Sequence, residues 1–202
     1  MASPQSFPFG GEILSTDGSA VLYPAFIESS GADLLLDELI STNNWEQQTL
    51  LMYGKAVEEP RLSTWHSDGQ SYTYSGAARV PQSWTPSLLS IRALCESQTN
   101  HTFNGVLVNF YRDGNDYLGW HSDDELVNGP EPLIASISLG AERRFEMRHR
   151  ESGDMASVML SHGSLLVMSG LSQQCWEHRV PKMPRLNDSR VNLTFRHLLP
   201  DS

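Results

Sequence analysis

The sequence predicts an α+β protein in which N-terminal helices pack on the outside of a double-stranded β-helix, the jelly-roll fold. Two stretches before residue 100 have the periodicity of helices, whereas the chain after residue 100 consists of short strand-like runs separated by Gly, Pro, Asn and Asp. Runs at this spacing are typical of β-sandwiches and barrels. The chain has 202 residues, enough to bury a sizeable core, so we expect a single domain.

The N-terminal segment, residues 1–20, contains Pro4, Pro8 and the pair Gly10-Gly11 and has no sustained periodicity. We expect it to form an arm that lies on the surface or is loosely ordered. The domain should then span residues 21–202, with its jelly-roll core at about residues 100–200.

Two helices are predicted before the core. The first should start at Ser29 or Ser30, because either residue can cap a helix, and continue through Ile40. Acidic side chains early in this run suit the positive end of the helix dipole. The second should start at Thr85, with Pro86 as its first helical residue, and its apolar positions continue with helical spacing to about residue 95.

Six strand-like runs follow, at residues 105–111, 133–139, 144–148, 156–160, 164–169 and 190–196. Side chains alternate between the two faces of a strand, so in residues 105–111 Asn109 and Tyr111 share a face opposite valine and phenylalanine. In the last run, one face carries Arg190, Asn192, Thr194 and Arg196. Both strands therefore separate hydrogen-bonding groups from apolar ones.

The net charge of -10 argues against a protein that coats nucleic acid by bulk attraction, although it does not restrict what a local groove can bind. Seven acidic residues precede the first basic residue, Lys55. We therefore expect an anionic ligand to contact the later part of the chain.

Compartment and assembly are predicted from what the sequence lacks. Cys95 and Cys175 are the only cysteines, no basic and apolar leader is visible, and no apolar run approaches the roughly 20 residues of a membrane span. We expect a reduced, cytoplasmic, monomeric protein without a membrane partner.

A metal site is suggested by His121 and Asp123, which lie two positions apart and can grip one ion from the same side of the backbone. A later histidine, His178, would complete a set of two imidazoles and one carboxylate. This set leaves three open positions on an octahedral ion, as in non-haem Fe(II) oxygenases. The alternative is that the His-x-Asp pair occurs by chance and that these histidines are structural.

Arg190 and Arg196 lie on one strand face and could converge on a small dianion, because a guanidinium bonds both oxygens of a carboxylate. The alternative is a solvated face at a sheet edge, where such charges oppose aggregation. Asn109 and Tyr111 could likewise lie on the wet face of an antiparallel sheet.

In their order, these elements resemble the AlkB family of Fe(II)- and 2-oxoglutarate-dependent dioxygenases, particularly its DNA-repair branch. The resemblance runs from about Tyr53 to Arg196. Its motifs are Asn109-x-Tyr111-x-x-Gly114-x-Asp116-x(4)-His121-x-Asp123-x-Glu125, Ile134-Ala135-Ser136-Ile137-Ser138-Leu139-Gly140, Trp176-x-His178-x-Val180-Pro181 and Arg190-Val191-Asn192-Leu193-Thr194-Phe195-Arg196.

The resemblance implies a role for each matching residue. The catalytic metal, Fe(II), would be bound by His121, Asp123 and His178. The cosubstrate 2-oxoglutarate would be held by Asn109, Tyr111, Arg190, Thr194 and Arg196, and O2 would be the second cosubstrate.

The same resemblance implies a nucleotide-recognition lid at about residues 50–80 that covers a flipped base. Its substrate-binding residues would be Tyr53, Gly54, Lys55, Tyr72, Thr73 and Tyr74. Lys55, Arg61 and Arg79 would be candidates for phosphate contacts. The alternative for the tyrosines is an aromatic hairpin that packs on its own core.

Asp124 and Glu125 are further candidates for substrate binding. Bases methylated on a ring nitrogen, such as 1-methyladenine and 3-methylcytosine, carry positive charge, so acidic residues would favour them over the neutral base. Alternatively, these two residues orient groups around the metal ligands.

Residues 143–150 contain four arginines and one acid and are the best candidate for contacts with phosphates. The overall acidity makes a preference for duplex DNA doubtful, so single-stranded DNA and RNA remain open.

The predicted function is oxidative demethylation of N-alkylated nucleobases in DNA, with release of succinate, CO2 and formaldehyde. One alternative is oxygenation of modified RNA or of a protein side chain by the same iron core. A second alternative is a non-catalytic jelly-roll binding module that keeps a metal for structure.

Overall fold

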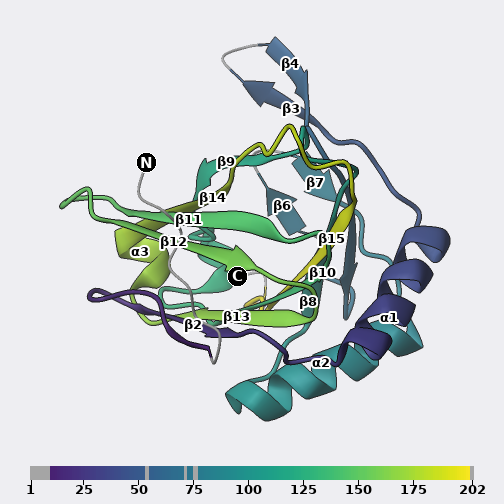
Figure 1. The fold of residues 1–202 in the computed structure, drawn as a ribbon, viewed down its shortest axis with the longest axis horizontal. Coiled ribbons are helices and arrows are strands. Elements are labelled where there is room, and N and C mark those ends of the chain that lie inside the picture. The colour runs from purple at the N-terminus through teal and green to yellow at the C-terminus, as the bar shows by residue number, and fades with distance from the viewer. Residues whose placement is uncertain (1–9, 53–54, 71, 75–76, 201–202) are drawn as a thin grey trace.

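The computed structural model describes residues 10–52, 55–70, 72–74 and 77–200, and it confirms the predicted jelly roll flanked by helices (Figure 1). The larger sheet has the order β1 (Gly11–Glu12), β2 (Ser19–Tyr23), β13 (Ser164–Ser169), β10 (Ile134–Gly140), β15 (Arg190–Arg196), β8 (Gly105–Tyr111) and β5 (Leu62–Ser67). The smaller sheet has the order β12 (Met155–Leu160), β11 (Arg143–His149), β14 (Trp176–Val180) and β9 (Leu118–His121).

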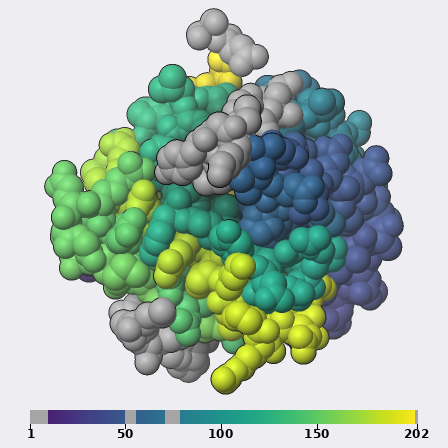
Figure 2. Space-filling model, turned by 90° about the horizontal axis from the view of Figure 1, so that it is seen from above, coloured from purple at the N-terminus to yellow at the C-terminus, as the bar shows by residue number. Residues whose placement is uncertain are grey.

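Two antiparallel hairpins lie outside these sheets. They are formed by β3 (Thr49–Met52) with β4 (Lys55–Glu58), and by β6 (Tyr72–Tyr74) with β7 (Ala77–Arg79). Two short helical turns, η1 (Leu126–Asn128) and α3 (Ser172–Cys175), complete the described elements. Segments from the first, middle and last parts of the chain, coloured blue, teal and yellow, adjoin on the face shown in Figure 2.

The long helices are α1 (Ser29–Thr42) and α2 (Pro86–Thr99), close to their predicted bounds. Pro86 is the first residue of α2, and the Thr85 hydroxyl accepts a hydrogen bond from the Leu88 amide at 3.2 Å, as predicted. Helix α1 differs at its start, because Ser29 is already helical and the N-cap residue, Glu28, makes no side-chain capping bond.

Helices α1 and α2 cover the outer face of the larger sheet (Figure 1). Fully buried Leu39, Leu88 and Ile91 pack there against the apolar faces of β8 and β15, including Val108 and Phe195. A fully buried side chain of this size contributes roughly 1.5–3 kcal/mol by leaving water. Because these faces are occupied by the helices, the opposite faces of β8 and β15 point between the two sheets.

A second apolar cluster fills the space between the sheets. The larger sheet contributes Ile134 and Leu166, and the smaller sheet contributes Phe145, Met147 and Trp176. The two layers are thus held face to face around an interior that also contains the polar side chains of β8 and β15.

The predicted N-terminal arm ends earlier than residue 20. Ser19 and Ala20 belong to β2, which pairs with β13, and Ala20 is fully buried. Residues 1–9 lie outside the described residues. Within the described ranges, no helix combines the length and apolar character needed to cross a membrane.

Candidate metal and cosubstrate site

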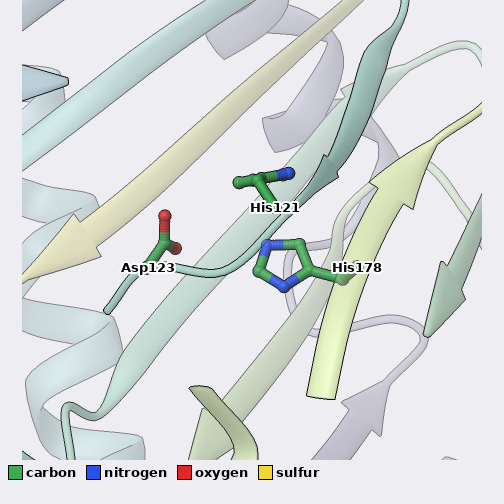
Figure 3. A group of neighbouring side chains, drawn as sticks. All are labelled: His121, Asp123 and His178. Carbon is green, nitrogen blue, oxygen red and sulfur yellow. The ribbon is translucent and has the colours of Figure 1, made fainter. Parts of the chain in front are cut away.

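Three side chains that are far apart in the chain meet between the sheets (Figure 3). Strands β9 and β14 are antiparallel neighbours, and their register puts His121 directly opposite His178, with ring centroids 4.2 Å apart. Asp123 follows two residues after the end of β9. One ligand atom from each of these three residues lies within 4.8 Å of the other two.

Hydrogen bonds fix the orientation of these groups. His121 Nδ1 lies 2.9 Å from the Gly119 carbonyl oxygen, so Nδ1 carries the proton and Nε2 keeps a lone pair. The Asp123 amide donates to Gln173 Oε1 at 3.0 Å, and Asp123 Oδ1 accepts from Arg196 Nη2 at 2.8 Å. These contacts leave His121 Nε2 and the Asp123 carboxylate close enough together to bind one metal ion.

The electrostatics favour the protonation state that a metal requires. Burial alone would raise the pKa of Asp123. Its interactions with the cation of Arg196 and with the two histidines outweigh burial and hold that pKa at about 2. Burial lowers the pKa of His178 to about 3 and also lowers the pKa of His121. At neutral pH the site therefore offers two neutral imidazoles and one carboxylate, the forms that bind metals.

This donor set fits a divalent transition metal such as Fe(II). His178 Nδ1 is buried and has no hydrogen-bond partner among the residues described, which is costly for a polar atom unless a ligand is supplied. His121, Asp123 and His178 line a cavity with a volume of about 40 Å³, which is more than the space that one water molecule needs.

All five residues predicted to hold the cosubstrate line the same cavity as the metal ligands. They are Asn109, Tyr111, Arg190, Thr194 and Arg196. The register of β8 and β15 explains this grouping, because Tyr111 lies opposite Arg190 and Asn109 lies opposite Asn192. The polar faces predicted for β8 and β15 therefore lie side by side and form one continuous surface of the cavity.

Arg190 has the properties of an anion site. Its side chain is 1% exposed, its Nη2 donates to Ser138 Oγ at 2.9 Å, and its guanidinium lies 5.1 Å from the Tyr111 ring centre. Nε and Nη1 have no hydrogen-bond partner among the described residues. Burial lowers the pKa of Arg190 to about 10, which still leaves it cationic at neutral pH. A carboxylate is the natural partner for such a buried cation.

Arg196 and Thr194 contact other protein groups in this cavity. Arg196 forms a buried ion pair with Asp123, and Thr194 donates from Oγ1 to Asn192 Oδ1 at 3.0 Å. Their predicted contacts with a cosubstrate stay predictions.

Asn192 and Ser136 also line the cavity, and Asn192 Nδ2 donates to Ser136 Oγ at 2.8 Å. Neither was predicted as a site residue, although alternation in the last strand placed Asn192 on the correct face.

The predicted substrate residues of the lid are only partly described. Tyr53 and Gly54 lie outside the described residues. Lys55 is in β4, and Tyr72, Thr73 and Tyr74 form β6, but only the backbone of these four residues is described. Their predicted roles stay predictions.

Asp124 and Glu125 do not line the cavity that holds the metal ligands. Asp124 is exposed and accepts from Arg150 Nη2 at 2.9 Å, and Glu125 accepts from Asn128 Nδ2 at 2.8 Å. These contacts fix the loop that follows Asp123. The predicted role of the two acids in substrate binding, and the alternative that they orient groups around the metal ligands, both stay predictions.

Three arginines predicted to contact phosphates are buried instead, so this prediction was wrong for them. Arg61 and Arg79 are 2% and 3% exposed and share the carboxylate of Glu59. Arg143 is 1% exposed and donates to the carbonyl oxygens of Asp113, Asp116 and Pro181. The sequence shows a cluster of cations, but not which of them face inward to internal acceptors.

Comparisons with known proteins agree with this geometry. A family model described as the 2OG-Fe(II) oxygenase superfamily matches residues 19–196. The chain is 42% identical over 190 residues to the alpha-ketoglutarate-dependent dioxygenase alkB homolog 3 of Homo sapiens, covering 89% of this chain and 66% of the relative. It is 36% identical over 199 residues to the DNA oxidative demethylase ALKBH2 of Mus musculus, covering 93% of this chain and 83% of the relative.

Among solved structures, that of OsALKBH1 aligns with a TM-score of 0.65 over 93% of this chain and 100% of that chain. At 17% identity, this likeness shows the fold alone. The chain spans just under two thirds of the length of the human alkB homolog 3, of which 66% is covered.

Proposed function

Since the chain belongs to the 2OG-Fe(II) oxygenase superfamily and, within it, to the AlkB family, we propose that it is an oxidative demethylase of N-alkylated nucleobases in DNA. The lesions would be of the 1-methyladenine and 3-methylcytosine type. The observation that carries the proposal is the meeting of His121, Asp123, His178 and Arg190 in one buried cavity. Two imidazoles, one carboxylate and a buried guanidinium are the groups that an iron ion and a ketoacid require.

When bound, Fe(II), 2-oxoglutarate and O2 would supply the oxidation of the N-methyl carbon, with succinate, CO2, formaldehyde and the restored base as products. Holding the metal would fall to His121 Nε2, to an imidazole nitrogen of His178 and to Asp123. Arg196 donates to Asp123 Oδ1, and the carboxylate keeps further lone pairs that could bind the metal. Arg196 also keeps this carboxylate ionised, which maintains the ligand charge that the metal needs.

Arg190 would hold a carboxylate of 2-oxoglutarate and thereby orient it toward the metal ligands. The ring centre of Tyr111 lies 5.1 Å from the guanidinium of Arg190 and 5.4 Å from that of Arg143. Arg143 is itself fixed by three backbone carbonyls. This packing restricts the motion of Arg190 before any ligand binds, which reduces the entropy cost of binding.

A basic groove on the smaller sheet supports a nucleic-acid substrate. The groove has a volume of about 430 Å³, and its lining includes Arg144, Arg179, Lys182 and Arg185 with Glu146 as the single acid. Arg179 pairs with Glu146 at 2.6 Å, whereas Lys182 and Arg185 form no ion pair within the described part of the chain. These two cations would be available to phosphates, whose neutralisation provides most of non-specific affinity.

Aromatic and cationic side chains also lie together on this face. The guanidinium groups of Arg148 and Arg179 lie 4.7 Å and 4.4 Å from the ring of Trp120. Surfaces that combine aromatic rings with arginine suit single strands, because bases stack on the rings while the cations follow the backbone. Single-stranded DNA is therefore the substrate we propose to test first.

The test is the product mass from a panel of oligonucleotides incubated with the protein, Fe(II), ascorbate and 2-oxoglutarate. The panel contains 1-methyladenine in single-stranded DNA, in duplex DNA and in RNA. The proposal predicts loss of one CH2 unit from methylated DNA and no loss with the His178→Ala variant. Turnover of 2-oxoglutarate without any change in DNA mass would contradict it, and a change confined to RNA would assign the alternative substrate.

A further inference from the structure

A buried ion cluster lies behind the wall of the candidate site. Glu59 Oε1 accepts from Arg61 Nη2 at 3.2 Å, and Glu59 Oε2 accepts from Arg79 Nη2 at 3.1 Å. The three side chains are 1%, 2% and 3% exposed, respectively. One carboxylate is therefore shared by two guanidinium groups, which leaves the cluster with a net positive charge next to the cavity.

Each member of the cluster belongs to a different part of the structure. The Glu59 amide donates to the Gln48 carbonyl oxygen at 2.8 Å, which extends the β3–β4 hairpin beyond β4. Arg79 is the last residue of β7 in the second hairpin, and it also contacts the hydroxyl of Ser63 in β5. Arg61 stands immediately before β5. The carboxylate of Glu59 thus joins the bases of both hairpins to the larger sheet.

Arg61 connects this cluster to the candidate site. Its side chain lines the cavity, and its Nε donates to Asn109 Oδ1 at 2.9 Å. Asn109 is one of the residues predicted to hold 2-oxoglutarate. Glu59 itself does not line the cavity. Arg61 is the member of the cluster that both pairs with Glu59 and lines the cavity.

Stability alone is a weak explanation for this arrangement. Taking three charged groups out of water is expensive, and apolar side chains of similar size often stabilise a protein as well or better. The Glu59 carboxylate fixes the direction of each guanidinium group, which an apolar side chain in its place would not do. The Arg61 guanidinium is held from one side by Glu59 and bonded to Asn109 on the other.

We propose that Glu59 is a positioning residue for the cosubstrate side of the site: it holds Arg61 against Asn109 and links that contact, through Arg79, to the second hairpin. The inference rests on the part of the proposed function that concerns 2-oxoglutarate binding. Without Glu59, Arg61 loses the carboxylate that holds its Nη2, and Asn109 loses the donor that orients its amide. Groups that orient ligand-binding residues typically change affinity by about 10–100-fold when they are replaced.

The test measures 2-oxoglutarate affinity by calorimetry with Mn(II) in place of iron, so that no turnover occurs. Replacing Glu59 alone leaves two buried cations without a carboxylate and endangers folding. The main variant is therefore the double change Glu59→Gln with Arg79→Met, which keeps the net charge of the cluster. The matched control is Glu58→Gln, which makes the same chemical change at an exposed neighbouring residue.

We expect the double variant to unfold within a few degrees of wild type and to bind 2-oxoglutarate about tenfold more weakly, while Glu58→Gln leaves the affinity unchanged. Arg61→Lys should weaken binding to a similar extent. Combining Arg61→Lys with the double variant should cause little further loss, because both changes disrupt the same contact.

Two results would overturn the inference. One is unchanged 2-oxoglutarate affinity in the folded double variant. The other is a fold-loss of affinity in the triple variant that equals the fold-loss of the double variant multiplied by that of Arg61→Lys. Wild-type protein that binds no 2-oxoglutarate with Mn(II) would instead contradict the proposed function, and the inference with it. Cosubstrate affinity does not depend on which nucleic acid is the substrate, so the two failures are distinguishable.

Discussion

Arg190 is the residue on which cosubstrate affinity should depend most. It is a buried cation that forms no ion pair with any residue in the described ranges, and its partners there are the uncharged groups Ser138 and Tyr111. An isolated charge is expensive to bury. An anionic ligand offsets the cost of burying the unpaired Arg190 guanidinium. The protein therefore gains stability when the anion binds, and this gain adds to the affinity for the ligand.

Replacing Arg190 by Met should raise the dissociation constant of 2-oxoglutarate by about 30-fold or more, because truncating one partner of a buried charge pair costs roughly 2–5 kcal/mol. Calorimetry with Mn(II) measures the change. The control is Arg144→Met, which removes a half-buried cation from the basic groove. Equal affinities in wild type and Arg190→Met would mean that the ketoacid binds elsewhere.

The roles of single residues were predictable where residue type and order in the chain carry the information. His121, Asp123 and His178 were predicted in this way, and they meet in space. Gln173 and Glu59 were not, because their importance depends on partners 50 and 20 residues away, the Asp123 amide and Arg79. A buried glutamine or glutamate looks the same in the sequence as an exposed one.

At the scale of elements, β8 and β15 combine two functions on opposite faces. The apolar faces pack against α1 and α2, and the polar faces line the cavity. The period of two along a strand makes this division possible. It also allows stability and ligand binding to be changed separately by mutation.

Phe195→Ala should lower the free energy of unfolding by about 3–5 kcal/mol, because it opens a cavity beneath the helices. Phe195 is fully buried next to Phe103 and Trp84. Chemical denaturation measures the loss, and Leu94→Ala, at a half-exposed position on α2, should change stability by less than about 0.5 kcal/mol. Below its unfolding transition, Phe195→Ala should bind 2-oxoglutarate normally. A selective loss of binding without destabilisation would contradict the two-faced description.

The elements that were predicted have strong periodicity or clear caps, as in α2 with Thr85 and Pro86 and in the strand from Arg190 to Arg196. The elements that were missed have neither. Strand β5 reads Leu-Ser-Thr-Trp-His-Ser, yet His66 and Ser63 are buried, since β5 pairs with β8 and its polar groups are bonded internally. Strand β14 covers only five residues, and the charged Glu177 and Arg179 alternate with His178. Such strands are defined by their neighbours rather than by their own sequence.

For the molecule as a whole, the charge distribution matters more than the net charge of -10. The helices cover the outer face of the larger sheet (Figure 1). The basic groove lies instead on the smaller sheet, where Arg144 and Glu146 of β11 and Arg179 of β14 line it. The face of the smaller sheet can therefore contact an anionic polymer such as a nucleic acid, although the protein as a whole is acidic. The fold class was predictable from the order of helices and strands, whereas the inward direction of Arg143 and the outward direction of Arg179 depend on sheet register.

The double variant Lys182→Glu with Arg185→Glu should weaken binding to a methylated single-stranded oligonucleotide and flatten its salt dependence. Each lost phosphate contact reduces the slope of log affinity against log salt by about 0.7 for single strands. Fluorescence anisotropy at several salt concentrations measures both effects. Arg92→Glu on α2 is the control and should change neither, since Arg92 lies on the helical side and pairs with Asp68 and Glu96. An unchanged slope in the double variant would remove the groove from the nucleic-acid surface.

The central claim is that His121, Asp123 and His178 hold one metal beside a guanidinium that binds a ketoacid. Thermal unfolding with and without Mn(II) and 2-oxoglutarate tests it most directly, because a ligand that binds only the folded state raises the unfolding temperature. We predict that 2-oxoglutarate stabilises wild-type protein only when Mn(II) is present, and that Asp123→Ala abolishes the effect. Equal stabilisation by 2-oxoglutarate without metal, or full stabilisation of Asp123→Ala, would contradict the account.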